Sequence, residues 1–395
     1  GKFYALPQAP QQYKQLLMVS GFDKYFQIAP CFRDEDARAD RSPGEFYQLD
    51  FEMSFATQED VFRVGEEVLT ATFEKFAPEG SVVTAAPYPV ISYKQAMLEF
   101  GSDKPDLRNP LRIVDVTDFF QRCTFKPFHG QTVRAIKVSN KMSKGFHEKL
   151  LKFATSIGMG GLGYLEVKED LSYKGPIDKF IPDDMKAEIR EIAGLKAGDT
   201  IFFIADKEKQ AALYAGQLRN ELGQRLDLLE KNAYRFCFIN DFPMYEYDEE
   251  QKKIIFTHNP FSMPQGGLEA LTTKDPLELL AYQYDIVCNG VELSSGAVRN
   301  HNLDIMVKAF EIAGYTEEDL KEKFGALYNA FQYGAPPHAG MAPGVDRMIM
   351  LLRNEENIRE VIPFPMNGNA QDVMCGAPNE VSEMQLREVH IKVRK

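Results

Sequence analysis

The residues best suited to chemistry are charged side chains that precede an alternating segment, within "FRDEDARADRSPGEFYQLDFEMSF" (residues 32–55). On an extended chain Arg33 and Glu35 project to the same side, one before and one after Asp34. An arginine can bind a phosphate or a carboxylate through two hydrogen bonds, and a glutamate can accept from an amine or an amide. The same residues could instead form a surface ion pair, worth at most roughly 1 kcal/mol. From these residues alone the surface ion pair is slightly favoured.

A second charged cluster lies in "YDIVCNGVELSSGAVR", residues 284–299, where Glu292 stands seven positions after Asp285 and seven before Arg299. The small residues between them would let a backbone approach a ligand. Asp285 and Glu292 could hold Mg²⁺, which takes few carboxylates together with water and substrate phosphate. Two acids on a solvated face explain the pattern equally well.

A third cluster is Arg347 at the start of the apolar helix expected in "GMAPGVDRMIMLL", residues 340–352. Helix N-termini favour anions, and an arginine adds to this preference. The Gly and Pro residues of the preceding Gly-Met-Ala-Pro-Gly stretch let the backbone come close to a ligand. A salt bridge between Asp346 and Arg347 would not require such a stretch, so an anion-binding site is favoured here. Gln11 and Lys14 share one face of another expected helix, which alone indicates only a polar face.

The composition is that of an ordinary globular protein, with 395 residues, 44% hydrophobic and 26% charged, enough for two or three domains. The net charge of −12 disfavours non-specific adhesion to nucleic acid or anionic membrane, although a local basic groove for RNA is compatible with it. No apolar run approaches the roughly 20 residues of a membrane helix. The first residue is Gly rather than Met, so we expect a fragment or a processed form.

The five cysteines are well separated and contain no Cys-x-x-Cys, which argues against a disulfide framework and a zinc ribbon. We expect five buried thiols in a reducing cytoplasm. There is neither a strand–GxGxxG–helix nor a GxxxxGK[ST] motif, so neither a dinucleotide site nor a P-loop is supported.

Two styles of secondary structure alternate along the chain. Residues 24–33 and 45–56 alternate like strands and predict an antiparallel hairpin with a long charged connection, and residues 57–76 predict a helix capped by Thr57. Residues 112–226 instead alternate strands and helices and lack the charge clusters, so we interpret them as an inserted α+β domain. The strand-rich style then returns, which makes a discontinuous unit of residues 1–111 and 227–395.

Taken together, these segments resemble a known family. Residues 32–55 resemble motif 2 of the class II aminoacyl-tRNA synthetases, and "GAPPHAGMAPGVDRMIMLL", near residues 334–353, resembles motif 3. "ALPQAPQQYKQLLMVSGFDKYFQIAPCFRDED" looks like the aspartyl version, and "GSDKPDLRNP" ahead of an inserted domain is similar to its bacterial type. The resemblance covers essentially the whole chain. It implies an α+β fold, with a class II antiparallel β-sheet flanked by helices and an inserted GAD-type domain.

The resemblance also implies the residues that bind ATP and metal. Arg33 and Arg347 are the implied catalytic residues, Arg33 on the α-phosphate and the substrate α-carboxylate, Arg347 on adenine and the γ-phosphate. Phe46 would stack on the other face of adenine. The implied ATP-binding set is Arg33, Asp34, Glu35, Ser42, Phe46, Glu292, Gly344, Val345, Asp346 and Arg347. The implied Mg²⁺ ligands are Asp285 and Glu292. The family often has Gln at the position of Ser42.

For the amino acid, the resemblance implies that Lys14 and Arg299 bind the side-chain carboxylate of aspartate and that Gln11 and Asp50 face its α-amino group. The implied aspartate-binding set is Gln11, Lys14, Arg33, Gln48, Asp50, His258 and Arg299. Asparagine is nearly the same size, but a neutral amide would leave two buried cations unpaired, at a cost of several kcal/mol. Positioning and charge stabilisation suffice for adenylate formation, because the α-carboxylate is already ionised.

The implied function is that of an aspartate–tRNA ligase, which uses ATP to form aspartyl-adenylate and transfers aspartate to the 3′ end of tRNA-Asp, with tRNA-Asn left open as a second acceptor. The resemblance also implies a cytoplasmic protein and a homodimer of the full-length chain. Motif 1 and the anticodon-binding OB-fold have no match here, and we expect both upstream of Gly1. The alternatives are an asparaginyl-type or asparagine-forming relative and a non-catalytic paralogue. Lys14 and Arg299 argue against an asparagine pocket, and Arg33, Glu292 and Arg347 argue against a mere binder.

Overall fold

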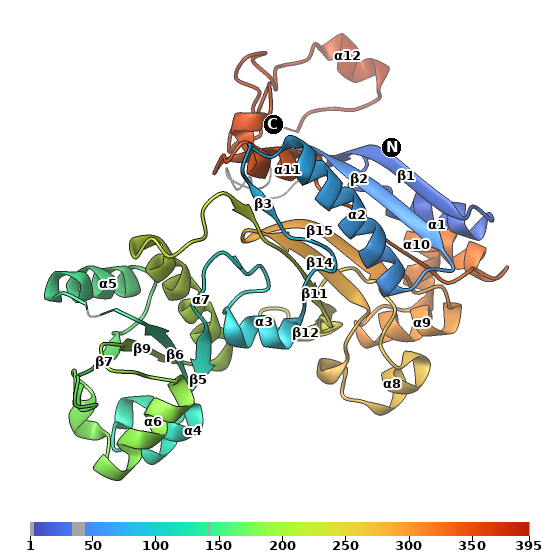
Figure 1. The fold of residues 1–395 in the computed structure, drawn as a ribbon. Coiled ribbons are helices and arrows are strands. Elements are labelled where there is room, and N and C mark those ends of the chain that lie inside the picture. Colours follow the sequence, from blue (N-terminus) through green and yellow to red (C-terminus); the bar gives the residue numbers. More distant parts are fainter. Residues whose placement is uncertain (1–3, 34–43, 141, 395) are drawn as a thin grey trace.

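The computed structural model describes residues 4–33, 44–140 and 142–394 (Figure 1). Its largest sheet has seven strands in the order β1-β2-β16-β15-β14-β11-β4. Neighbouring strands are antiparallel throughout this sheet, apart from the parallel pair of β11 and β4. The predicted α+β class with an antiparallel sheet is confirmed. The bounds are β1 Lys24–Phe32, β2 Glu45–Ser54, β4 Val90–Ser92, β11 Phe236–Asn240, β14 Gln283–Cys288, β15 Val291–Val298 and β16 His338–Met341.

The first two strands form the antiparallel hairpin that the alternation predicts. Lys24 pairs with Met53 at one end and Phe32 pairs with Glu45 at the other. The charged connection between them, residues 34–43, lies outside the described residues, and so do the site predictions for Asp34, Glu35 and Ser42. Because side chains alternate across a strand, Gln48, Asp50 and Glu52 all project to the same face of β2.

Helices flank this sheet, and α2 lies along one of its faces (Figure 1). The apolar side of α2, which includes Val61, Leu69 and Phe73, packs against Phe236 and Phe238 of β11 in one hydrophobic core. Helix α1 packs against α10 and against β2. The helices of this region are α1 Gln11–Val19, α2 Gln58–Phe76, α3 Tyr93–Glu99, α8 Gly267–Thr273, α9 Leu303–Ile312, α10 Glu317–Phe331, α11 Val345–Leu352 and α12 Glu383–Glu388.

A second, separate sheet has five antiparallel strands in the order β5-β6-β9-β7-β8. Alternate residues of β9 serve two cores, since Ile201 and Phe203 join one and Phe202 and Ile204 join the other. The strands are β5 Ile113–Asp115, β6 Thr132–Val138, β7 Gly163–Val167, β8 Tyr173–Lys174 and β9 Thr200–Asp206, and the helices are α4 Thr117–Arg122, α5 Lys144–Ser156, α6 Lys186–Ala193 and α7 Glu208–Arg225. The limits 112 and 226 of an inserted domain stay a prediction.

Smaller elements complete the described chain. Two two-stranded sheets pair β3 with β10 and β12 with β13. Their bounds are β3 Val82–Val83, β10 Ala233–Tyr234, β12 Tyr245–Asp248 and β13 Lys253–Phe256, and short 3₁₀ turns cover Lys126–Phe128, Asp178–Phe180, Asp183–Met185, Pro276–Glu278 and Ile358–Val361. Among the described residues, no helix combines the length and apolar character that crossing a membrane would require.

The cysteines correct one expectation. Four thiols are buried, those of Cys31, Cys123, Cys237 and Cys288, but Cys375 is exposed. The expectation of five buried thiols is therefore wrong for Cys375. This residue lies in the segment after α11, which contributes little to the cores, since Leu386 and Ile358 are its buried hydrophobic residues.

The start of α2 has the predicted Thr57 cap, which is completed by Asp60. The amide of Asp60 donates to Thr57 Oγ1 at 3.3 Å, and the amide of Thr57 donates to Asp60 Oδ2 at 2.9 Å. This reciprocal pair satisfies two amides that would otherwise lack an intrahelical acceptor.

We expect Thr57→Ala to lower the free energy of unfolding by about 1 kcal/mol, because it removes the capping hydroxyl of a helix that packs on the main sheet. Thr57→Ser keeps the hydroxyl and should stay close to the parent protein. Urea denaturation followed by circular dichroism would measure both. An equal loss in the two variants would show that the methyl group, not the cap, carries the effect.

Candidate active site

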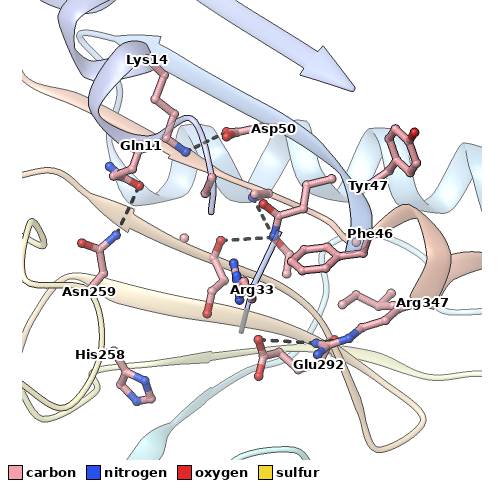
Figure 2. Close-up of a pocket in the computed structure, with 18 of the residues that line it drawn as sticks. Gln11, Lys14, Arg33, Phe46, Tyr47, Asp50, His258, Asn259, Glu292 and Arg347 are labelled. Carbon is pink, nitrogen blue, oxygen red and sulfur yellow. Dashed lines mark hydrogen bonds and ion pairs between the residues drawn. The ribbon is translucent and has the colours of Figure 1, made fainter. Parts of the chain in front are cut away.

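A cavity of about 360 Å³ opens between α1, β2, β15 and the start of α11. Figure 2 shows Lys14 directed at Asp50 and Arg347 lying beside Glu292. The structure brings most of the predicted site residues together here. Those that line the cavity are Gln11, Lys14, Arg33, Phe46, Gln48, Asp50, His258, Glu292, Arg299, Gly344, Asp346 and Arg347.

Two described residues of the predicted set lie elsewhere. Asp285 is buried behind the cavity wall and accepts a hydrogen bond from the hydroxyl of Ser295, which does line the cavity. Val345 packs against the main hydrophobic core. Asp285 itself therefore does not line the cavity, whereas its hydrogen-bond partner Ser295 does.

Sequence reasoning missed several polar residues of this site. Glu52 is fully buried and contacts both Lys14 and Arg299. The sequence could have indicated Glu52 as a site residue, since it lies two residues after Asp50 and therefore on the same face of the strand. Asn259 donates to Gln11 at 3.4 Å. The other missed polar residues that line the cavity are Tyr47, Gln283, Ser294 and Ser295.

The closed end of the cavity is a network of two cations and two carboxylates. Lys14 Nζ lies 2.7 Å from Asp50 Oδ1 and 3.4 Å from Glu52 Oε2. Arg299 Nε donates to Glu52 Oε1 at 2.9 Å and Nη2 donates to Glu52 Oε2 at 3.2 Å. All four side chains are almost completely buried. Buried charges of this kind are stable only when they are paired and hydrogen-bonded.

Strand order allows this network to form. Gly340 of β16 pairs with Glu52 of β2 on one side and with Ala297 of β15 on the other. A Cβ atom on Gly340 would lie 2.4 Å from Glu52 Oε2. The absence of a side chain at this position therefore leaves room for Arg299 to reach Glu52 across β16.

The two carboxylates of the network titrate differently. Burial raises the pKa of Asp50, and Lys14 offsets this only in part. Burial also acts to raise the pKa of Glu52, but Arg299 and Lys14 outweigh it, so that this pKa lies below its ordinary value. Asp50 Oδ2 is buried and has no hydrogen-bond donor among the described residues. It is an acceptor placed for a ligand that brings its own donor, such as an ammonium group.

This network corrects the expected basis of selectivity. Lys14 and Arg299 are not unpaired cations that wait for a substrate, because Asp50 and Glu52 already neutralise them. Rejection of a neutral amide cannot therefore rest on two bare charges.

The open end of the cavity carries arginines, an aromatic ring and the start of a helix. The guanidinium carbon of Arg33 lies 4.9 Å from the ring centroid of Phe46. Arg347 Nη1 donates to the backbone oxygen of Glu292 at 2.7 Å. The amide of Tyr47 donates to Asp346 Oδ2 at 2.8 Å, which fixes the first turn of α11 against β2. Asp346 therefore positions this helix end beside the cavity.

Asp285 and Glu292 fit a magnesium ion of the type that keeps few protein ligands. A β-bulge between β14 and β15 separates Asp285, which pairs with Ser295, from Glu292, which pairs with Val287. Burial and the nearby charge of Glu292 raise the pKa of Asp285 well above its ordinary value. A divalent cation would relieve this repulsion, and carboxylate oxygens are the ligands that Mg²⁺ prefers. Among the described residues, no larger group of metal-ligating side chains is found.

Two histidines lie in this region. His258 lines the cavity and packs edge-on against Phe242, with ring centroids 5.0 Å apart. Although this residue is exposed to solvent, partial desolvation of its ring lowers its pKa. His338 is fully buried, with Nε2 3.1 Å from Gln15 and Nδ1 2.8 Å from the carbonyl oxygen of Pro336. Burial lowers the pKa of His338 despite the opposing charge of Glu52. Both imidazoles are therefore suited to hydrogen bonding in the neutral form.

Comparison with known proteins places this sheet and cavity in one class. The family model described as tRNA synthetases class II (D, K and N) matches residues 1–368, and the chain belongs to this family. It is 59% identical over 400 residues to an aspartate–tRNA(Asp/Asn) ligase of Zymomonas mobilis, covering 100% of this chain and 67% of that protein. It is 57% identical over 397 residues to an aspartate–tRNA ligase of Streptomyces avermitilis, again covering 100% and 67%.

The chain thus spans about two thirds of the length of these relatives. Among solved structures, an aspartyl tRNA synthetase from Entamoeba histolytica aligns with a TM-score of 0.46 and 18% identity, over 92% of this chain and 52% of that chain.

We expect Glu52→Gln to destabilise the fold by about 3–5 kcal/mol, because it removes the carboxylate that Arg299 and Lys14 share and leaves a buried cation unpaired. Chemical denaturation would measure the loss. Glu59→Gln, at an exposed glutamate of α2, is the matched control and should change stability little. A Glu52 variant as stable as this control would contradict the network described above.

We expect stability to fall as the pH drops below about 6.5, the ordinary pKa of histidine. His338 has a lowered pKa in the folded protein, so the unfolded chain binds the additional proton first and acid favours unfolding. Melting temperatures between pH 7.5 and 5.5 would show the slope. His338→Asn should reduce the slope, whereas His390→Asn, at an exposed histidine, should leave it unchanged. Equal slopes in all three proteins would overturn this attribution.

Proposed function

We propose that this chain is the catalytic part of an aspartate–tRNA ligase. It activates L-aspartate with ATP to aspartyl-adenylate and transfers the aspartyl group to the 3′ end of tRNA-Asp. The observation that carries the proposal is the buried network of Lys14, Asp50, Glu52 and Arg299 at the closed end of a cavity that has arginines at its open end. Support comes also from relatives 55–59% identical over the whole chain that carry this name.

At the closed end, an exchange of ion-pair partners would seat the amino acid. The α-ammonium group donates to Asp50, whose Oδ2 has no donor among the described residues. Lys14 is then less tightly held by Asp50 and can turn to the side-chain carboxylate of aspartate, beside Arg299. Gln11, Gln48 and His258 line the surrounding wall.

Charge balance then explains the choice of aspartate over asparagine. The empty network holds two cations and two carboxylates. An α-ammonium group at Asp50 adds one positive charge, which a side-chain carboxylate balances and a neutral amide does not. In a buried site this imbalance costs several kcal/mol. Selectivity thus belongs to the whole network and not to two cations alone.

At the open end, Arg33 and Arg347 offset the repulsion between the carboxylate nucleophile and the phosphates. Phe46 offers a face on which adenine can stack, and Gly344 and Asp346 shape the backbone beside it. Asp285 and Glu292 are the residues that would hold Mg²⁺, which when bound neutralises phosphate charge. No general base is needed, because the attacking carboxylate is ionised at neutral pH. Catalysis rests on positioning and on charge stabilisation of an in-line attack on the α-phosphorus.

The acceptor tRNA and the assembly belong to the same proposal. Relatives with similar identity are named either for both tRNA-Asp and tRNA-Asn or for aspartate alone, so tRNA-Asn stays open as a second acceptor.

β1 is an edge strand of the main sheet with Phe26 and Ile28 exposed to 75% and 53%. An edge of this kind is normally covered, which supports a homodimer of the longer protein. We place the longer protein in the cytoplasm because of the function proposed for it. We also propose that residues 112–226 are an inserted domain of the catalytic unit 1–111 and 227–395.

The test is aspartate-dependent exchange of pyrophosphate into ATP by the full-length protein. We expect exchange with aspartate and not with asparagine, and loss of exchange of at least about 100-fold in Arg299→Ala and in Lys14→Met. Arg353→Ala, at an exposed arginine after α11, is the matched control. Melting curves show whether the variants fold.

Equal exchange with asparagine would favour the asparaginyl-type alternative. No exchange with either amino acid, in a protein that binds aspartate, would favour a non-catalytic paralogue.

A further inference from the structure

The segment "GSDKPDLRNP" has no part in the function proposed above, yet one of its side chains contacts a residue of the nucleotide end of the site. Lys104 Nζ lies 3.3 Å from Glu292 Oε2 and 2.9 Å from Asp103 Oδ2. Its side chain is 30% exposed, and that of Glu292 is 26% exposed. The lysine thus connects a loop between α3 and β5 with a carboxylate of the proposed metal pair.

The position of this loop is set by packing against α7. The guanidinium of Arg219 is almost completely buried and donates to the backbone oxygens of Asp106, Asn109 and Leu111. The side chain of Asn109 donates in return to the backbone oxygen of Arg219 at 2.9 Å. These bonds hold the part of the loop that follows Lys104, so the placement of Lys104 next to Glu292 does not depend on an exposed, loosely held chain.

The loop also approaches the helix and the strand turn closely. A Cβ atom on Gly216 of α7 would lie 2.5 Å from the backbone oxygen of Gly101. A Cβ atom on Gly290, in the turn between β14 and β15, would lie 3.4 Å from Cβ of Asp106. The loop is therefore packed between α7 and the turn that precedes Glu292.

Glu292 stands between two cations. Lys104 lies at Oε2, and Arg347 Nη1 lies 3.8 Å from Oε1. A divalent ion held by Glu292 must share this carboxylate with the lysine or displace it. Asp103 offers Lys104 a second acceptor within reach, and a flexible lysine stem can move between two acceptors at little cost.

We propose that Lys104 is a positioning residue of the nucleotide site, whose ammonium group holds Glu292 in the place of a divalent cation until nucleotide and metal bind together. The lysine then stays with Asp103 and leaves Glu292 to the metal. The site is thereby kept from binding a divalent ion tightly without nucleotide. This inference rests on the proposed assignment of Asp285 and Glu292 to the metal.

The test is binding of Mn²⁺ to the full-length protein without nucleotide, followed by electron paramagnetic resonance. We expect Lys104→Met to bind Mn²⁺ at least about fivefold more tightly than the parent protein, because it removes one positive charge next to the ligand carboxylate. Lys104→Arg keeps the charge and should restore weak binding. Lys94→Met, at an exposed lysine of α3, is the matched control for loss of one charge and should not change the affinity.

A double variant separates this role from a general loss of charge. In a Glu292→Gln background, Lys104→Met should no longer change the affinity for Mn²⁺, since the lysine acts through that carboxylate. Unchanged affinity in the single variant, or an equal gain in the Glu292→Gln background, would overturn the inference. Pyrophosphate exchange by the parent protein tests the proposed function separately, so that failure of one is distinguishable from failure of the other.

Discussion

The interaction on which this site depends is the pairing of Glu52 with both Lys14 and Arg299 inside the protein. Such a network is stable only if every charge finds a partner, and here three segments supply them: α1, β2 and the end of β15. All four side chains are buried, so in the proposed function an amino acid would bind by rearranging the charges of this network.

The main sheet provides the geometry for this pairing. β16 lies between β2, which carries Glu52, and β15, which Arg299 directly follows, and Gly340 of β16 leaves the space in which the two side chains meet. Gly296 of β15 likewise has no room for a side chain, since a Cβ atom there would lie 2.5 Å from the backbone oxygen of Gly340. The small residues that we interpreted from the sequence as room for a ligand thus also allow neighbouring strands to lie close together.

The nucleotide end of the cavity differs from the closed end in how far its charged side chains are buried. Arg347 and Glu292 at this end are partly exposed, and they contact each other between the start of α11 and β15. Exposed charges of this kind can rearrange when phosphate and metal arrive, whereas the buried network at the closed end cannot do so without a matching ligand. In the proposed function, the closed end of the cavity would bind the amino acid and the open end would bind the nucleotide.

The sequence by itself determined those features of the fold that depend on patterns of a few neighbouring residues. Alternation predicted the hairpin of β1 and β2, and the Thr57 cap predicted the start of α2, because these features depend on neighbours a few residues apart. The roles of individual site residues came from the family resemblance. Only the tertiary structure decided that Glu52 joins Lys14 to Arg299 and that Lys104 meets Glu292. Those partners are far apart in sequence, and the order of the strands and the packing of a loop on α7 bring them together.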